Sequence, residues 1–254
     1  MGTNNKIALI TGGSRGLGKN AAITLAGKGI DVIITYRSKK EEAEAVVAEI
    51  EKKGQKGAAL ALDTAKTRTF DIFFGQLAGI LTKKWGRENF DFLINNAGID
   101  APSRFADTTE EAFDNLFNVH FKGVYFLTQK ALPFLADKGR IVNLSTGLTR
   151  FATPGYAAYA SMKGAIEVFT KYLAKELGSR GITANMVAPG ITKTDFTQAA
   201  FEGNPQLEAF MSSQTALGRV GVPEDIGGVI AFLCSEESRW VTAQRIEASG
   251  GLFL

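Results

Sequence analysis

Two tyrosines and a lysine lie within eight positions in the segment YAAYASMK (156–163). Tyr156, Tyr159 and Lys163 are three and four residues apart, so on a helix they share one face. A phenol one turn before an ammonium can act as a general acid or base, because the positive charge stabilises the phenolate. The same spacing also occurs in ordinary amphipathic helices with a solvated lysine. Its meaning therefore depends on what the rest of the chain places around it.

A glycine-rich segment, TGGSRGLG (11–18), directly follows the first apolar run and opens a helical pattern. Gly12 lets the chain turn sharply off a strand. Gly16 and Gly18 remove side chains where backbone must approach a pyrophosphate and where the helix packs on the strand. The N–H groups of the helix N-terminus then face the phosphates. The alternative is that the glycines only make a tight turn, but the strand–loop–helix context favours dinucleotide binding.

Short apolar runs alternate with longer amphipathic stretches from end to end. Most of the runs are continuously apolar, which is typical of parallel strands covered on both faces. The pattern predicts an α/β fold, a single-domain doubly wound Rossmann fold over residues 1–254, with helices on both faces. We expect about seven parallel strands, at 6–11, 31–36, 57–63, 90–96, 140–145, 182–188 and 244–248.

Three helix starts are readable in the spaces between these strands. Ser38 with Glu41, and Thr108 with Glu111, have the spacing of a capping box. Pro223 opens a further helix at the position where its missing N–H is harmless.

Composition excludes several classes of protein. The net charge is only +3 in 254 residues, without a basic tract, so nucleic acid is not an expected partner. No apolar run approaches the roughly 18 residues of a membrane span, and the N-terminus lacks a signal-peptide core. One cysteine, Cys234, and one histidine, His120, argue against a disulfide framework and against a metal site. We expect a soluble cytoplasmic protein without a metal.

Further motifs follow the glycine loop in a fixed order: NNAG (95–98), Asn118, Tyr159-x-x-x-Lys163 and APG (188–190). From Lys6 to about Gly251 the chain resembles the short-chain dehydrogenase/reductase family. Each motif is weak alone, but their order over the whole chain is specific. The resemblance implies the strand order 3-2-1-4-5-6-7 and a nicotinamide cofactor.

The end of the second expected strand indicates which cofactor. An acidic residue there would accept hydrogen bonds from the 2′-hydroxyl of NAD, but the chain has Arg37 and no carboxylate. Arg15 lies inside the glycine loop, and guanidinium groups attract a 2′-phosphate. These residues predict NADP(H). The alternative is that Arg37 and Lys39–Lys40 merely cover a solvated helix start, which leaves the missing acid unexplained.

The resemblance also implies the rest of the cofactor site. Asp63 would bind the adenine edge, NNAG would pack along the adenosine ribose, and 189–195 would cover the nicotinamide. The candidate cofactor-binding residues are Thr11, Gly12, Ser14, Arg15, Gly16, Leu17, Gly18, Tyr36, Arg37, Ser38, Asp63, Thr64, Asn95, Asn96, Ala97, Gly98, Tyr159, Lys163, Pro189, Gly190, Thr192 and Thr194.

Four residues are the candidate catalytic set. Tyr159 would be the general acid or base, and Lys163 would lower its pKa from about 10 by about three units, roughly 4 kcal/mol. By resemblance, Asn118 would hold a water for proton relay. Thr146 stands where the family has a substrate-orienting serine, with Ser145 as the alternative. His120, two residues after Asn118, is expected to be structural.

The expected activity is hydride transfer between NADP(H) and a carbonyl or alcohol. The substrate segment 194–219 is rich in phenylalanine and alanine, which favours an apolar or acyl substrate, as in 3-oxoacyl-carrier-protein reductases. The alternative is a non-catalytic NADP(H)-binding sensor or subunit. Thr146 favours that alternative and the Tyr159–Lys163 pair argues against it. The resemblance further implies a homotetramer or homodimer through the helices that carry Asn118 and Tyr159.

Overall fold

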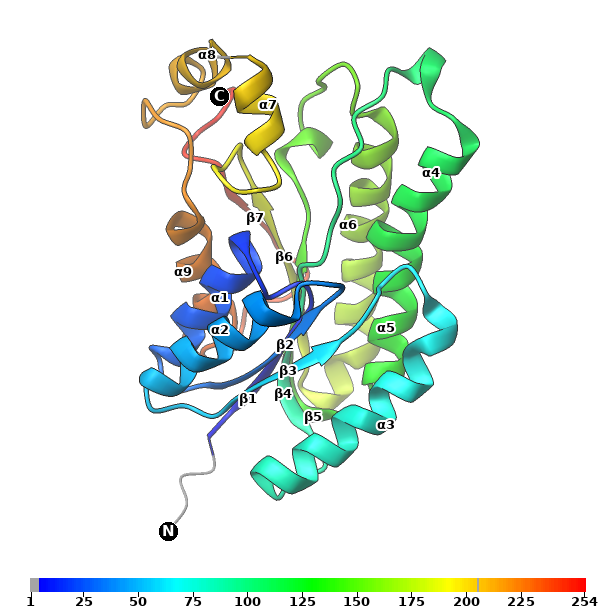
Figure 1. Ribbon diagram of the computed structural model, residues 1–254, viewed down its shortest axis with the longest axis vertical. Coiled ribbons are helices and arrows are strands. Elements are labelled where there is room, and N and C mark those ends of the chain that lie inside the picture. The colour runs from blue at the N-terminus through cyan, green and yellow to red at the C-terminus, as the bar shows by residue number, and fades with distance from the viewer. Residues whose placement is uncertain (1–4, 205) are drawn as a thin grey trace.

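The central element is a seven-stranded sheet in which every paired neighbour is parallel (Figure 1). The computed structural model describes residues 5–204 and 206–254. The strand order is β3-β2-β1-β4-β5-β6-β7, so the predicted doubly wound fold and its order are confirmed. The strands are β1 (Ile7–Ile10), β2 (Asp31–Tyr36), β3 (Gly57–Ala61), β4 (Phe90–Asn95), β5 (Leu135–Leu144), β6 (Thr183–Pro189) and β7 (Arg245–Ala248).

Helices cover both faces of this sheet (Figure 1). One layer contains α1 (Gly16–Ala26), α2 (Lys40–Lys52) and α9 (Pro223–Leu233). The other contains α3 (Phe70–Ile80), α4 (Glu110–Phe117), α5 (Gly123–Ala131) and α6 (Ala157–Leu177). Two short helices, α7 (Gln198–Gly203) and α8 (Leu207–Ser213), follow β6 and lie beside the C-terminal end of the chain. Both belong to the predicted substrate segment 194–219.

The continuous apolar runs are explained by two separate cores. Successive strand side chains point to opposite faces, so Ile7 and Leu9 pack with α3, α5 and α6. Ala8 and Ile10 pack with α1, α2 and α9. Each of these four residues is completely buried. Both faces of β1 must therefore be apolar, which removes the polar alternation of a one-sided sheet.

β1 lies between β2 and β4, so the connections leave it in opposite directions and the loops after β1 and β4 diverge. Side chains hold these two loops together at the carboxyl edge of the sheet. The Thr11 hydroxyl oxygen accepts hydrogen bonds from the N–H groups of Asn96, at 2.9 Å, and Ala97, at 3.0 Å. The Asn96 amide donates in return to the carbonyls of Thr11 and Gly12. This edge is where an open α/β sheet binds ligands.

The helix starts are only partly as predicted. Pro223 does open α9. The Ser38 capping box is wrong, because α2 begins at Lys40 with Lys39 as an N-cap that has no side-chain bond. The Thr108 start is wrong by one residue, since the hydroxyl of Thr109 caps α4 through the Ala112 N–H at 3.2 Å.

β5 also begins five residues earlier than expected. Within the described residues, no helix is both long and apolar enough to cross a bilayer.

The glycine loop depends on close backbone approach. Gly12 has φ of +65°, a left-handed conformation that favours glycine. A Cβ on Gly18 would lie 2.3 Å from the Gly12 carbonyl oxygen and 2.4 Å from the Asn96 amide nitrogen. No side chain fits between α1 and the loop at this point.

Gly18→Ala is therefore expected to lower the free energy of unfolding by roughly 1–3 kcal/mol, because loop backbone must shift to admit the methyl group. Gly75→Ala in α3 is the matched control, since a Cβ there meets no atom within 4 Å. That variant should be neutral or gain about 0.5–1 kcal/mol from helix propensity. Urea unfolding followed by circular dichroism measures both, and equal stabilities would contradict the packing argument.

Candidate active site

The predicted site residues gather at the carboxyl ends of β1 to β6, on one edge of the sheet. The N-terminus of α1 opens onto this edge. Its N-cap, Arg15, is extended and makes no side-chain capping bond, and its first turn carries no acid. The segment after β6 approaches the same loop, because a Cβ on Gly16 would lie 3.7 Å from the Thr194 side chain. The uncapped helix N-terminus is an electrostatically favourable place for a phosphate.

The end of β2 distinguishes Arg37 from the lysines that follow it. Lys39 pairs with Glu42 and Lys40 with Glu44, each at 3.5 Å along α2. Arg37 is exposed and makes no ion pair or hydrogen bond within residues 5–204 and 206–254. The lysines are therefore the residues that cover the helix start. Arg37 keeps its guanidinium available beside the glycine loop.

Two other predicted cofactor contacts are engaged within the protein. The Asp63 carboxylate accepts a hydrogen bond from the Ala65 N–H at 3.1 Å. The Asn95 amide turns into the core, where it donates to the Thr128 hydroxyl at 3.0 Å and to the Asn143 side chain at 2.8 Å. Asn95 thus ties β4 to β5 and α5. A side-chain role for Asn95 toward a cofactor receives no support from this geometry.

The segment after β6 forms the opposite wall. The Gly190 N–H donates to the Ala248 carbonyl at 3.0 Å, and a Cβ on Gly190 would lie 2.8 Å from the Ser249 Cα. Thr192 is buried and its hydroxyl donates to the Gly190 carbonyl at 3.1 Å. The Thr192 side chain is therefore used inside the turn, which leaves backbone groups and Thr194 to face a ligand.

Tyr159 and Lys163 lie one turn apart on α6, as the spacing predicts. Lys163 is only 5% exposed, and its Nζ donates to the Leu144 carbonyl at 2.7 Å. The same Nζ lies 5.7 Å from the centroid of the Tyr159 ring. Burial lowers the Lys163 pKa from 10.5 to about 8. The ammonium is thus held beside the phenol and away from bulk water.

The expected acidification of Tyr159 is absent from this state. Desolvation of the phenol raises its pKa above the ordinary value of 10, and the charge of Asp100 raises it further. Only a hydrogen bond from Thr146 acts in the opposite direction. The simple Coulomb argument from Lys163 failed because it ignored the loss of solvent around the phenol. Tyr159 is therefore neutral at pH 7 and carries a proton to give.

Strand alternation separates Thr146 from Ser145. The Ser145 hydroxyl points away from the centre and donates to the Glu167 carboxylate at 2.8 Å. The Thr146 side chain lies near enough to Tyr159 to lower its pKa, and it accepts the Leu148 N–H at 3.3 Å. The geometry therefore favours Thr146 as the hydroxyl that can orient a substrate.

His120, for which the sequence predicted a structural role, lies directly beside Tyr159. It is buried, and its ring packs edge-to-face on Tyr159 with centroids 5.0 Å apart. Its Nε2 lies 2.8 Å from the Ile99 carbonyl oxygen, while its Nδ1 has no partner within the described residues. Burial and then the Lys163 charge lower the His120 pKa from 6.5 to about 3. A neutral imidazole thus lies against the Tyr159 ring, beside Lys163.

Asn118 lies in the helical segment between α4 and α5. It begins a π-helical turn, Asn118–Lys122, that joins α4 to α5, and it is half-buried at a surface hollow beside Thr109 and Asp114. Within the described residues its side chain has no hydrogen bond to Tyr159 or Lys163. The π turn inserts an extra residue into the helical phase, so regular spacing could not identify which side chain faces inward. The feature of the sequence that could have identified the inward-facing residue was a single histidine, His120, in an apolar segment.

Aromatic rings and one carboxylate complete the surroundings of Tyr159. The rings of Tyr156 and Phe196 lie 6.3 and 6.4 Å from it. Asp100, which the sequence motifs did not single out, acts on both tyrosines and raises their pKa values. The arrangement offers a proton donor, an ammonium and a hydroxyl beside apolar walls. Such a set can protonate an oxygen on an apolar molecule.

Because His120 is the sole histidine, its protonation can be followed directly. We expect its NMR ring signals to remain unchanged from pH 8 to pH 5, since the folded pKa is about 3. The unfolded chain takes up this proton near pH 6.5, so His120 stabilises the fold above pH 6.5 and loses that contribution as the pH falls toward 3. A titration midpoint near 6.5 in the folded protein would contradict the buried neutral ring.

Comparisons with known proteins agree with this geometry. The family described as Enoyl-(Acyl carrier protein) reductase matches residues 12–253. The 3-oxoacyl-(acyl-carrier-protein) reductase FabG of Staphylococcus aureus is 36% identical over 251 residues, which is 98% of each chain. The promiscuous reductase LugOII, which catalyses keto-reduction at C1 during lugdunomycin biosynthesis, has a TM-score of 0.92, 38% identity and 98% coverage of both chains. Angucycline C-6 ketoreductase LanV with bound NADP has the same TM-score and identity, over 98% of this chain and 95% of its own.

Proposed function

This chain belongs to the short-chain dehydrogenase/reductase family, and we propose that it is an NADPH-dependent ketoreductase in which Tyr159 donates the proton. One observation carries the proposal: a buried ammonium, Lys163, lies 5.7 Å from the ring of Tyr159, a phenol that burial keeps neutral. A protein that only binds a dinucleotide has no need of this arrangement.

The residues present fit the cofactor. The uncapped N-terminus of α1 suits the pyrophosphate, and the close contacts at Gly12 and Gly18 leave the loop backbone bare. Arg37 and Arg15 would hold the 2′-phosphate, since a planar guanidinium bonds phosphate oxygens in pairs. Arg15 now lies 3.3 Å from Asp195 in an exposed pair, which is weak enough to exchange for a phosphate. When bound, the reduced cofactor supplies the hydride that attacks the carbonyl carbon.

Thr146 and Tyr159 act on the carbonyl oxygen. Both hydroxyls can donate hydrogen bonds to that oxygen, which polarises the carbonyl and fixes its orientation. The Tyr159 proton then moves to the oxygen as negative charge develops there, so the ketone becomes an alcohol. The raised pKa of Tyr159 favours this direction, because the phenol is fully protonated before the step.

Lys163 and His120 act on the phenolate that remains. Lys163, with a pKa of about 8, is mainly an ammonium at pH 7 and stabilises the negative phenol oxygen. We assign to His120 the support of the Tyr159 ring through their edge-to-face contact. The relay role expected for Asn118 remains a prediction, whereas the His120 ring lies 5.0 Å from the Tyr159 ring.

We assign an apolar ketone as the substrate class. Tyr156 and Phe196 flank Tyr159, and the substrate segment brings further apolar side chains above the sheet edge. LugOII and LanV are described as reducing ketones, and FabG as reducing a 3-oxoacyl carrier protein. The aromatic surroundings favour the ketone over the carrier-bound acyl group.

We further propose that the protein is a homo-oligomer, assembled through α5 and α6. Their outer faces expose Tyr125, Phe126, Val168 and Tyr172, a set of large apolar side chains on adjacent helices. Burial against a second copy would remove this surface from water. A cytoplasmic location remains the prediction from the sequence.

Tyr159→Phe tests the reaction assignment. It should lower kcat about a thousandfold with a small ketone, because the proton donor is lost, while the Kd of NADPH changes by less than about twofold. Tyr156→Phe is the control, since the same hydroxyl is removed one turn away, and it should cost less than about threefold. NADPH absorbance measures turnover and fluorescence measures binding. Equal activity of Tyr159→Phe and wild type would refute the assignment.

Arg37→Ala tests the cofactor assignment. It should raise the KM for NADPH about tenfold and leave that for NADH unchanged, because only NADPH presents the 2′-phosphate. Lys40→Ala removes a neighbouring cation that pairs with Glu44 and should change neither KM by more than about twofold. Tighter binding of NADH than of NADPH by the wild type would overturn the assignment.

A further inference from the structure

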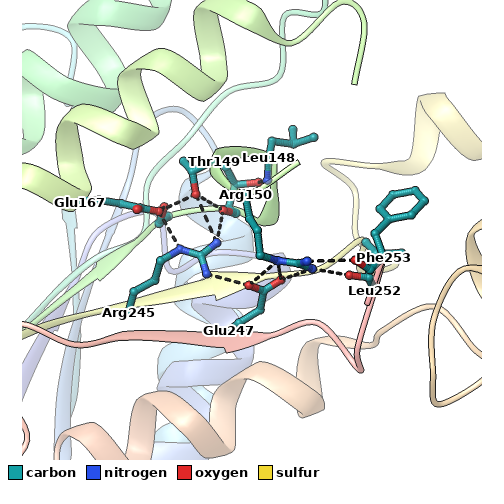
Figure 2. Close-up of polar contacts among 10 residues, drawn as sticks. Leu148, Thr149, Arg150, Glu167, Arg245, Glu247, Leu252 and Phe253 are labelled. Atoms are coloured by element: carbon teal, nitrogen blue, oxygen red, sulfur yellow. Dashed lines mark hydrogen bonds and ion pairs between the residues drawn. The ribbon is translucent and has the colours of Figure 1, made fainter. Parts of the chain in front are cut away.

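Four charged side chains of alternating sign form a continuous ion-pair network beside the candidate site (Figure 2). Glu167 on α6 bonds Arg245 at 2.8 Å, and Arg245 bonds Glu247 on the same strand at 2.7 Å. Glu247 accepts three hydrogen bonds from Arg150, two from Nε at 3.1 Å and one from Nη2 at 3.0 Å. The two acids and two guanidinium groups balance, and they are about one-fifth to one-third exposed. Partial burial makes such a network stronger than isolated surface pairs.

At one end of this network, Arg245 and Glu167 bond the residues around Thr146. Arg245 donates to the Thr146 carbonyl at 3.0 Å and to the Thr149 hydroxyl at 3.2 Å. Glu167 accepts hydrogen bonds from the hydroxyls of Ser145 and Thr149, at 2.8 and 2.6 Å. Glu167 follows Lys163 by one helical turn, so the catalytic helix itself supports this segment. The position of the Thr146 hydroxyl therefore depends on these charged groups.

At the other end of the network, Arg150 bonds residues near the C-terminus. Arg150 donates to the carbonyls of Leu252 and Phe253, the latter at 3.0 Å (Figure 2). The rings of Phe151 and Phe253 pack edge-to-face with centroids 4.7 Å apart. The segment 146–151 is thus bonded to the last residues of the chain.

Those last residues also bond the substrate segment. The Gly250 and Gly251 carbonyls accept the N–H groups of Leu217 at 3.0 Å and Ala216 at 3.2 Å. The Phe253 N–H donates to the Gln214 carbonyl at 2.9 Å. Residues 250–253 therefore lie between segment 146–151 and residues 214–217, which directly follow α8.

We propose that Arg150 and residues 250–253, here called the C-terminal strap, position segment 146–151 against the substrate segment and so decide which ketones the site accepts. Arg150, Arg245, Glu167 and Glu247 are positioning residues in this proposal. Arg150 acts through the far end of segment 146–151 and through the C-terminal strap, whereas the Thr146 carbonyl is held by Arg245. A large ketone contacts both walls and needs both in place, whereas a small ketone contacts Tyr159 and Thr146 alone.

The proposal rests on the proposed ketoreductase function and is tested with Arg150→Met, which keeps the aliphatic stem and removes the guanidinium. The expected result is a five- to tenfold rise in KM for the bicyclic ketone 1-tetralone, with changes below about twofold for cyclohexanone and for NADPH. Removal of residues 252–254 should give the same shift in preference. The two changes combined should give little more than either alone, because they break one linkage.

Arg180→Met is the matched control. Arg180 is 34% exposed in its side chain against 35% for Arg150, and it likewise bonds one carboxylate, Asp137, and two backbone carbonyls. It lies at the amino end of β5, away from the strap, so its loss should leave the ratio of the two ketone KM values unchanged. An equal ratio in Arg150→Met and Arg180→Met would overturn the proposal. If Arg150→Met fails to fold, Glu247→Gln removes the same charge contact with less loss of volume. Its ratio of the two ketone KM values is then compared with that of Arg180→Met in the same way.

A second readout does not need turnover. Amide hydrogen exchange in segments 146–151 and 214–217 should be faster in Arg150→Met than in Arg180→Met, because the strap no longer holds them. If the wild type reduces neither ketone, the proposed function fails. The exchange rates would still show whether the C-terminal strap holds the two segments in place. If exchange in both segments is unchanged, the strap is refuted while the ketoreductase assignment stands.

Discussion

The arrangement depends on an ammonium buried at the end of a strand. Lys163 is almost inaccessible to water, and its Nζ donates a hydrogen bond to the carbonyl of Leu144, the last residue of β5. Holding a charge there is costly unless the surrounding groups are fixed. Asn143 and Thr170 provide that rigidity, since their side chains bond at 2.9 Å and tie β5 to α6 one layer deeper. Thr146, Ser145 and Tyr159 take their places from this same strand–helix contact.

The fold explains why the glycine loop and the Tyr159–Lys163 pair lie at the same edge of the sheet. Parallel strands end at one edge, and the reversal of strand order at β1 leaves the loops after β1 and β4 facing a common opening. The glycine loop occupies one side of that edge and α6 the other. The ion-pair network from Glu167 to Arg150 connects this edge of the sheet to the C-terminus. Residues 250–253 therefore contact segment 146–151, which lies about a hundred residues earlier in the sequence.

The sheet could be predicted from sequence because burial on both faces leaves an unmistakable pattern, and β2 was located to the residue. Local chemistry was less predictable. Ser38 was not the cap of α2, because the helix begins at Lys40 with Lys39 as its N-cap. The contact of His120 with Tyr159 could not be read from regular helical spacing, because the π turn at Asn118–Lys122 breaks that spacing. The pKa of Tyr159 was estimated from one charge pair, although desolvation, which no sequence pattern displays, has the larger effect.

The most direct test is the titration of the Lys163 ammonium itself. In heteronuclear NMR spectra of the labelled protein, the side-chain signal that disappears in Lys163→Met belongs to this lysine. The account predicts a midpoint near pH 8 for that signal, below the ordinary lysine value of 10.5. A midpoint near 10.5 would mean that the ammonium is solvated, and the buried proton-transfer centre described above would not exist.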